Sequence, residues 1–108
     1  MHVRNTIHRD IKGANILVDN NGTCKLTDFG TATRISSIME KMPKEPLVLK
    51  GTLNWMAPEV IKQTMLGRQS DIWSVGCTVL EMATGQPPWF SLAKPNCTSV
   101  RRYYLLKN

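Results

Sequence analysis

The stretch HRDIKGANILVDNNGTCKLTDFG, residues 8–30, decides how this chain folds. Residues 16–18 and 24–27 within it are two short runs of β-prone side chains. Residues 19–22, with the sequence DNNG, lie between these runs and form a strong turn signal, because Asn and Gly tolerate the positive φ of tight hairpins. The stretch therefore predicts a β-hairpin over residues 15–28.

Polar side chains are expected to meet at the open end of this hairpin. We centre the turn on Asn21 and Gly22. Antiparallel pairing then places Asn15 beside Asp28, and Asp10 precedes them in the loop that enters the hairpin. Two carboxylates and an amide oxygen are hard ligands that suit Mg²⁺, which is commonly shared with substrate phosphates. The sequence thus offers a magnesium site, and the alternative is that these Asp and Asn residues simply flank turns.

Three short motifs follow one another in an order that is typical of one family. Residues 8–15 read HRDIKGAN, residues 28–30 read DFG and residues 57–59 read APE. They match the catalytic loop, the D-F-G element and the A-P-E element, so the chain resembles a eukaryotic protein kinase over residues 1–90. The resemblance implies an α+β fold, of which the chain holds part of the mainly helical C-terminal lobe. Residues 91–108 form an unassigned tail.

The resemblance implies a role for each matching residue. Asp10 would accept the proton of the substrate hydroxyl, or orient that hydroxyl, and Asn15 and Asp28 would hold Mg²⁺ against the phosphates of ATP. Lys12 would face the transferred phosphate. Thr52 would bridge Asp10 and Lys12. Lysine and threonine at these two positions are typical of serine/threonine kinases, so the resemblance implies transfer of the ATP γ-phosphate to Ser or Thr of a protein substrate.

Two further stretches indicate the group within the family. Residues 71–82, DIWSVGCTVLEM, and residues 85–89, GQPPW, are similar to the MAP kinase kinase kinase group, with the sterile-20-like kinases as the competing group. The expected protein substrate is then a MAP kinase kinase in a MAP-kinase-type cascade. Leu53 departs from the family pattern, because most relatives have proline at this position, and this bears on the local loop geometry.

His8 and Arg9 precede the catalytic aspartate and are expected to serve the loop rather than the chemistry. The resemblance implies that His8 helps to hold the catalytic loop. Kinases with an arginine at the position of Arg9 are often activated by phosphorylation, when the new charge pairs with it. The candidate phosphate acceptors are Ser36, Ser37 and Thr52.

A central helix is predicted over residues 71–84, after a shorter one over residues 59–66. Ser70 and Asp71 offer an N-cap and Gly85 a C-terminal stop. By resemblance, Asp71 also bonds the backbone of the catalytic loop. Apolar groups lie on nearly every face of this helix, which is typical of a helix at the centre of a protein. The rest of the chain is too small to cover it, which suggests that part of the domain is missing.

The ATP-binding part of a kinase is also missing from the sequence. Kinases hold ATP between two lobes, and the small lobe supplies a Gly-rich loop, a lysine and a glutamate. The sequence contains no G-x-G-x-x-G stretch. One hypothesis is that the chain is a fragment of an active serine/threonine kinase. The other is that it is a non-catalytic remnant or interaction piece, and in either case we expect the 108 residues alone to be inactive.

Composition limits the other function classes. The net charge of +6 is spread along the chain without a run of five to eight basic residues, which favours a solvated basic surface over nucleic-acid binding. The three cysteines lie far apart without C-x-x-C spacing, so neither a disulfide framework nor a zinc site is indicated. No apolar run approaches the roughly 18 residues of a membrane helix. We expect a cytoplasmic protein without a membrane or nucleic-acid partner.

Overall fold

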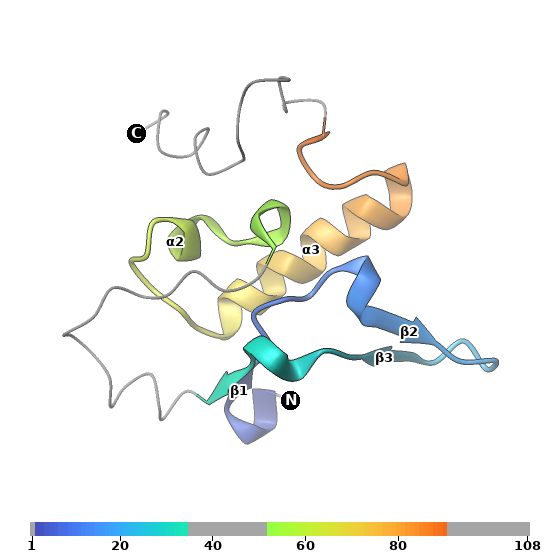
Figure 1. The fold of residues 1–108 in the computed structure, drawn as a ribbon, viewed down its shortest axis with the longest axis horizontal. Helices are drawn as coiled ribbons and strands as arrows, with labels where there is room; N and C mark the ends of the chain where they lie inside the picture. The colour runs from blue at the N-terminus through green and yellow to red at the C-terminus, as the bar shows by residue number, and fades with distance from the viewer. Residues whose placement is uncertain (1, 35–51, 91–108) are drawn as a thin grey trace.

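The computed structural model describes residues 2–34 and 52–90. In chain order, its elements are η1 (His2–Arg4), β1 (Thr6–Ile7), η2 (Gly13–Asn15), β2 (Ile16–Val18), β3 (Cys24–Leu26), η3 (Phe29–Thr31), β4 (Thr33–Arg34), η4 (Leu53–Trp55), α2 (Pro58–Ile61) and α3 (Arg68–Thr84). The strands form two antiparallel pairs, β1 with β4 and β2 with β3. In Figure 1, α3 runs through the middle, with the β2–β3 hairpin to one side and α2 to the other. The arrangement is the mixed α+β class that was predicted.

The β2–β3 hairpin forms where the sequence predicts it, but its loop is longer than a two-residue turn. The carboxylate Oδ1 of Asp19 accepts hydrogen bonds from the N–H groups of Asn21 and Thr23, each at 2.9 Å. The N–H of Asp19 also donates to the carbonyl of Thr23 at 3.0 Å. These bonds close a loop over residues 20–22, in which Gly22 takes a φ of 80°.

This loop shifts the register of the hairpin by one residue. Ile16 pairs with Leu26, and the N–H of Thr27 donates to the carbonyl of Asn15 at 2.9 Å. The expected pairing of Asn15 with Asp28 is therefore wrong. Asp28 lies one residue beyond Thr27, which is the partner of Asn15. The side chain of Asp19 fixes the length of the loop and thereby the register.

Helix α3 begins earlier than the predicted start at Asp71. The residue before its first turn is Gly67, whose N–H donates to the hydroxyl of Ser70 at 3.4 Å. Ser70 therefore caps the helix from inside the first turn, and Asp71 is not an N-cap. The predicted stop is confirmed: Gly85 has a φ of 69°, and its N–H donates to the carbonyl of Glu81 at 2.8 Å.

Helix α2 is shorter than the predicted helix over residues 59–66. Gln63 takes a φ of 58°, in the left-handed region that ends a helix, and the N–H of Thr64 returns to the carbonyl of Glu59 at 3.0 Å. The side chain of Glu59 accepts a hydrogen bond from the Ser70 hydroxyl at 3.3 Å. This bond ties α2 to the start of α3.

The core lies where the catalytic loop, η4 and α2 meet one face of α3. Its buried hydrophobic side chains are Ile7, Ile11, Trp55, Met56, Ala57, Ile61 and Cys77. A buried hydroxyl adds to the contact: Ser74 of α3 donates to the carbonyl of Trp55 at 2.7 Å. The core therefore fixes the position of η4 relative to the middle of α3.

The two faces of α3 are used in opposite ways. Its buried face is largely polar and includes Ser70, Asp71, Ser74 and Thr78. Its large hydrophobic side chains are 44–62% exposed at Ile72, Val75, Val79 and Leu80, and 64% exposed at Met82. The expectation that the chain is too small to cover this helix is confirmed for the described residues.

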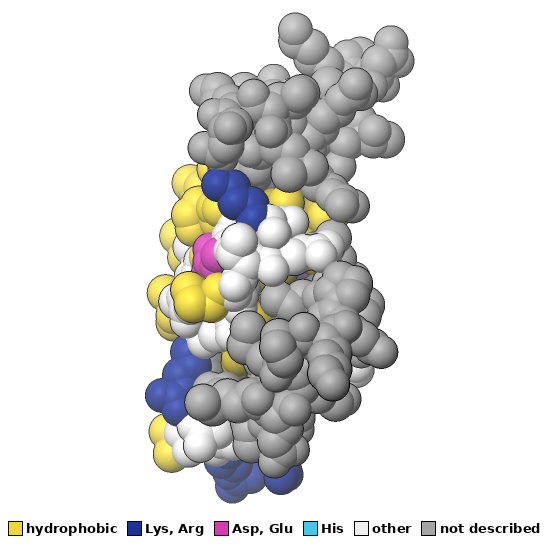
Figure 2. Space-filling view, turned by 90° about the vertical axis from the view of Figure 1, so that its left-hand side faces the viewer, with side chains coloured by type: hydrophobic (Ala, Val, Ile, Leu, Met, Phe, Trp, Pro, Cys, Tyr) yellow, Lys and Arg dark blue, Asp and Glu magenta, His cyan; other side chains and the backbone are white. Residues whose placement is uncertain are grey.

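Hydrophobic side chains also reach the surface along one edge of the face in Figure 2, beside Lys and Arg side chains. Within the two described ranges, no helix is both long enough and apolar enough to cross a membrane.

Candidate active site

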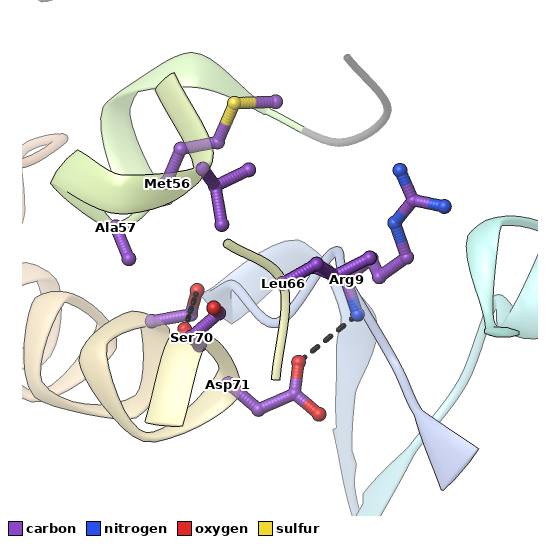
Figure 3. Close-up of a pocket in the computed structure, with 8 residues that line it drawn as sticks. Arg9, Met56, Ala57, Leu66, Ser70 and Asp71 are labelled. Carbon is purple, nitrogen blue, oxygen red and sulfur yellow. Dashed lines mark hydrogen bonds between the residues drawn. The ribbon is translucent and has the colours of Figure 1, made fainter. Parts of the chain in front are cut away.

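The catalytic loop, residues 8–15, is anchored to α3 by a buried carboxylate. Asp71 is 1% exposed and accepts hydrogen bonds from the backbone N–H of His8 at 2.8 Å and of Arg9 at 3.0 Å. Figure 3 shows the second of these bonds beside a small pocket that Met56 helps to line. Arg9 has a φ of 74°. A buried charge is tolerated only when it is hydrogen-bonded, so the loop and the helix stabilise each other here, as the resemblance predicted for Asp71.

His8 connects this loop to the end of the hairpin. Its ring is fully buried, with Nδ1 3.2 Å from the N–H of Asp10 and Nε2 2.8 Å from the carbonyl of Thr27. A backbone N–H can only donate, so Nδ1 is the acceptor and Nε2 carries the proton. The ring also packs edge-on against Phe29, with ring centroids 4.8 Å apart. These contacts confirm that His8 helps to hold the loop.

Two side chains of the catalytic loop meet a distant one in what we call the Asp10 cluster, which consists of Asp10, Lys12 and Thr52. The Thr52 hydroxyl donates to Asp10 Oδ1 at 2.8 Å and accepts from Lys12 Nζ at 2.8 Å. The Thr52 N–H also donates to Asp10 Oδ1 at 3.1 Å, and Lys12 Nζ lies 3.9 Å from Asp10 Oδ2. The expected bridge therefore forms, although Leu53 replaces the proline of most relatives at the start of η4.

Asn15 and Asp28, which we call the Asn15–Asp28 pair, have different surroundings. Asn15 is 7% exposed, and its Nδ2 donates to the carbonyl of Asp10 at 2.8 Å and to Asp10 Oδ2 at 3.2 Å. Asp28 is exposed, takes a φ of 56° and accepts from the N–H of Gly30 at 3.4 Å. Within the described ranges, Asp28 forms no hydrogen bond with Asn15 or with the Asp10 cluster.

Asn15 and Asp28 each keep an oxygen acceptor of the kind that Mg²⁺ binds. Both amide hydrogens of Asn15 are used in bonds to Asp10, so the amide oxygen is left as an acceptor. The carboxylate of Asp28 has a single, long hydrogen bond. Residues 2–34 and 52–90 contain no group of three or more His, Cys, Asp or Glu suited to a metal. A magnesium ion here would take much of its coordination from water and phosphate oxygens.

The family description "Protein kinase domain" matches residues 1–105. This chain belongs to the protein kinase family. Protein kinases use ATP and Mg²⁺, which agrees with the donor set of the Asn15–Asp28 pair.

The relatives of this kinase chain identify its group. It is 53% identical over 94 residues to mitogen-activated protein kinase kinase kinase A of Dictyostelium discoideum, covering 87% of the chain and 10% of the relative. It is 56% identical over 90 residues to mitogen-activated protein kinase kinase kinase YODA of Arabidopsis thaliana, covering 82% and 10%. It is 51% identical over 89 residues to serine/threonine-protein kinase STE11 of Saccharomyces cerevisiae, covering 82% and 12%. The predicted group is confirmed, and the chain spans about a tenth of the length of these curated relatives.

Arg9 of the kinase loop is held beside the short strand β4. Its Nη1 donates to the hydroxyl of Thr33 at 3.1 Å, and burial lowers the pKa of its guanidinium from the ordinary value. Ser36 and Ser37, two candidate phosphate acceptors, lie outside the described residues. The third candidate is Thr52, whose hydroxyl is already bonded in the Asp10 cluster. A phosphate on Thr52 would place negative charge against Asp10, so this position is a poor acceptor.

Sequence reasoning missed one side chain of the kinase site. Glu81 of α3 accepts hydrogen bonds from the N–H of Gly13 at 2.9 Å and from the indole Nε1 of Trp55 at 3.1 Å. One signal was available: Glu81 is an acidic residue in a helix of mostly small and apolar ones, and helical spacing sets it near the buried face that carries Asp71 and Thr78. Its two partners, however, are known only from the folded chain.

Proposed function

We propose that the protein carrying this chain is a serine/threonine kinase that transfers the γ-phosphate of ATP to a protein substrate. Asp10 accepts or orients the proton of the attacking hydroxyl, Lys12 faces the transferred phosphate, and Thr52 holds the two side chains together. Asn15 and Asp28 would hold Mg²⁺, which neutralises the charge of the phosphates when it is bound.

One observation carries this proposal. A single oxygen, Thr52 Oγ1, lies 2.8 Å from both Asp10 Oδ1 and Lys12 Nζ. Phosphoryl transfer depends mainly on positioned groups and on neutralised charge. The bridge fixes a proton acceptor and a cation relative to each other before any substrate arrives, which is the arrangement that such a reaction requires.

The remaining groups support Asp10 from the other side. Asn15 Nδ2 is 3.2 Å from Asp10 Oδ2, and the N–H of Asp10 donates to the His8 ring. Asn15 thus engages Oδ2 of Asp10, and Thr52 engages Oδ1. With both oxygens bonded, the carboxylate is held in one orientation. The Asp10 side chain can meet a substrate hydroxyl without first reorganising.

A hybrid enzyme tests the proposal. Residues 2–90 replace the matching segment in the kinase domain of yeast STE11, which supplies the Gly-rich loop and the rest of the large lobe. We expect the hybrid to phosphorylate a generic protein substrate on Ser or Thr, as judged by phosphoamino-acid analysis. The variant Lys62→Gln, at an exposed position outside the site, serves as the matched control. A folded hybrid without phosphotransfer, or one that phosphorylates tyrosine only, would contradict the proposal.

A second candidate function is favoured by the exposed face of α3. Hydrophobic side chains such as Val79 and Met82 are 57% and 64% exposed in this chain. A chain that exposes such a helix is suited to contact with another protein surface rather than to turnover alone. Retained activity of the hybrid together with an inactive isolated chain would assign catalysis to the longer kinase domain and leave this role for the chain alone.

We propose that the substrate of this kinase is one class of protein and not any protein with an accessible Ser or Thr. Relatives named as MAP kinase kinase kinases, together with the matching catalytic segment, support a MAP kinase kinase as the substrate. Phosphorylation of a purified MAP kinase kinase by the hybrid, at a higher kcat/KM than a generic substrate, is the expected result. The cytoplasmic location stays a prediction.

A further inference from the structure

The carboxylate of Glu81 joins two segments that lie far apart in the sequence. Its Oε2 accepts both the Gly13 N–H, at 2.9 Å, and the Trp55 indole N–H, at 3.1 Å. Gly13 begins η2 within the catalytic loop, and Trp55 ends η4. No Lys or Arg of the described residues forms an ion pair with Glu81. Its two neutral donors are therefore the contacts that hold this charge.

These two bonds close a ring that includes Lys12 and Thr52 of the Asp10 cluster. Gly13 directly follows Lys12, and Trp55 lies in the turn that Thr52 begins, since the Trp55 N–H donates to the Thr52 carbonyl at 3.0 Å. Lys12 and Thr52 are themselves bonded at 2.8 Å. The same two segments are thus connected twice, once at the reacting groups and once at Glu81. A ring of this kind resists sliding of one segment along the other.

The fit at Gly13 shows how closely Glu81 approaches the loop. A Cβ built on Gly13 would lie 2.9 Å from both carboxylate oxygens of Glu81, which is closer than atoms of ordinary side chains come. Lys12, the preceding residue, is extended, with φ −161° and ψ 165°. A proline at this position would have no N–H to donate and would carry a Cβ. Glycine allows the carboxylate to reach the N–H.

We propose that Glu81 is a positioning residue for phosphotransfer, which fixes the distance between the catalytic loop and the Thr52–Trp55 turn and thereby holds the Asp10 cluster together. The inference rests on the proposed function for its kinetic consequence, but the two hydrogen bonds themselves can be tested without activity. Because one oxygen accepts both bonds, a glutamine can replace the glutamate and keep them through its amide oxygen, whereas a leucine of similar size cannot.

The kinetic test compares Glu81→Gln and Glu81→Leu in the STE11 hybrid. We expect Glu81→Leu to lower kcat by about tenfold to a hundredfold, because a displaced catalytic group costs rate, with little change in KM for ATP or for the protein substrate. Glu81→Gln should keep at least about a third of kcat, since the acceptor oxygen is retained. Lys62→Gln is the control for loss of an exposed charge.

Two results would overturn the inference. Equal kcat values for the Gln and Leu variants would show that the acceptor oxygen has no positioning role. A raised KM for the protein substrate at unchanged kcat would show that Glu81 contacts the substrate instead. An inactive parent hybrid would contradict the proposed function and would leave the test of the hydrogen bonds to the isolated chain.

In the isolated chain, amide and indole hydrogen exchange reports the bonds directly. We expect protected protons at Gly13 N–H and Trp55 Nε1–H in the parent chain and in Glu81→Gln, and exchange at least about tenfold faster at both in Glu81→Leu. The Gly85 N–H, bonded within α3, controls for unfolding. Trp55→Phe removes one donor only, so Gly13 should stay protected there even if Glu81→Leu does not fold. Rapid exchange at Gly13 in a folded parent chain, or in a folded Trp55→Phe variant, would contradict the ring.

Discussion

The Asp10 cluster and the Asn15–Asp28 pair both lie at the junction of the catalytic loop and the hairpin, but the chain holds them differently. In the cluster, Thr52 is bonded to both of its partners at 2.8 Å. In the pair, Asn15 is fixed by Asp10, whereas Asp28 is exposed and bonded to Gly30 at 3.4 Å. The groups that would act on the substrate hydroxyl are held by other side chains, whereas the proposed metal ligand Asp28 is held by a single long hydrogen bond.

The largest effect is expected from Asp10→Asn in the STE11 hybrid. The amide cannot accept the substrate proton as a carboxylate does, so phosphotransfer should fall by about 1,000-fold. Added Mg²⁺ should not restore the rate, because the lost group belongs to the Asp10 cluster and not to the Asn15–Asp28 pair. Initial rates over a range of Mg²⁺ concentrations are the measurement. A loss smaller than about tenfold would remove Asp10 from the reaction.

A smaller and metal-dependent loss is expected from Asp28→Asn. A neutral amide is a weaker ligand for Mg²⁺, so the rate should fall by about 100-fold at low Mg²⁺ and recover in part as Mg²⁺ is raised. The free energy of unfolding of the chain should change by no more than about 0.5 kcal/mol, because the side chain is exposed. A loss that is independent of Mg²⁺ would contradict the role given to the Asn15–Asp28 pair.

The Thr52 bridge is tested by a matched pair of variants. Thr52→Val removes the hydroxyl and leaves the shape, so kcat should fall by about tenfold as Asp10 and Lys12 lose their common partner. Thr52→Ser keeps the hydroxyl and should retain most of the rate. If both variants lose the same amount, the methyl group matters and the hydroxyl bridge does not.

The smallest effect is expected for the isolated chain with Mg-ATP. The sequence has no Gly-rich loop, and the Asn15–Asp28 pair alone offers few ligands, so the melting temperature should rise by less than about 1 °C at millimolar Mg-ATP. Phosphotransfer by this chain alone should be undetectable. A clear thermal shift that disappears in Asp28→Asn would show that the Asn15–Asp28 pair binds Mg-ATP without the small lobe.

Local features of the sequence predicted the elements near the site better than their boundaries. The β-prone runs and the turn signal located the hairpin, because turn residues act through nearby backbone atoms. The register was missed because the side chain of Asp19 accepts two backbone hydrogen bonds, which lengthen the loop. A residue pattern does not show which backbone N–H groups a side chain will bind. The end of α3 at Gly85 was predicted, whereas its start was placed too late because Ser70 caps the helix from within.

The residues of the site also divide into those that are close in the sequence, which could be predicted, and those that only the fold brings together. Asp10, Lys12 and Asn15 lie within one short loop, and their motif, together with those at residues 28–30 and 57–59, was enough to select the protein kinase family. Residues 71–82 and 85–89 indicated the MAP kinase kinase kinase group. The meeting of Thr52 with Asp10, and of Glu81 with Gly13, joins residues that are distant in the chain. Which distant donor reaches which acceptor depends on how η4 packs on α3, so these contacts follow from the folded arrangement and not from the order of residues.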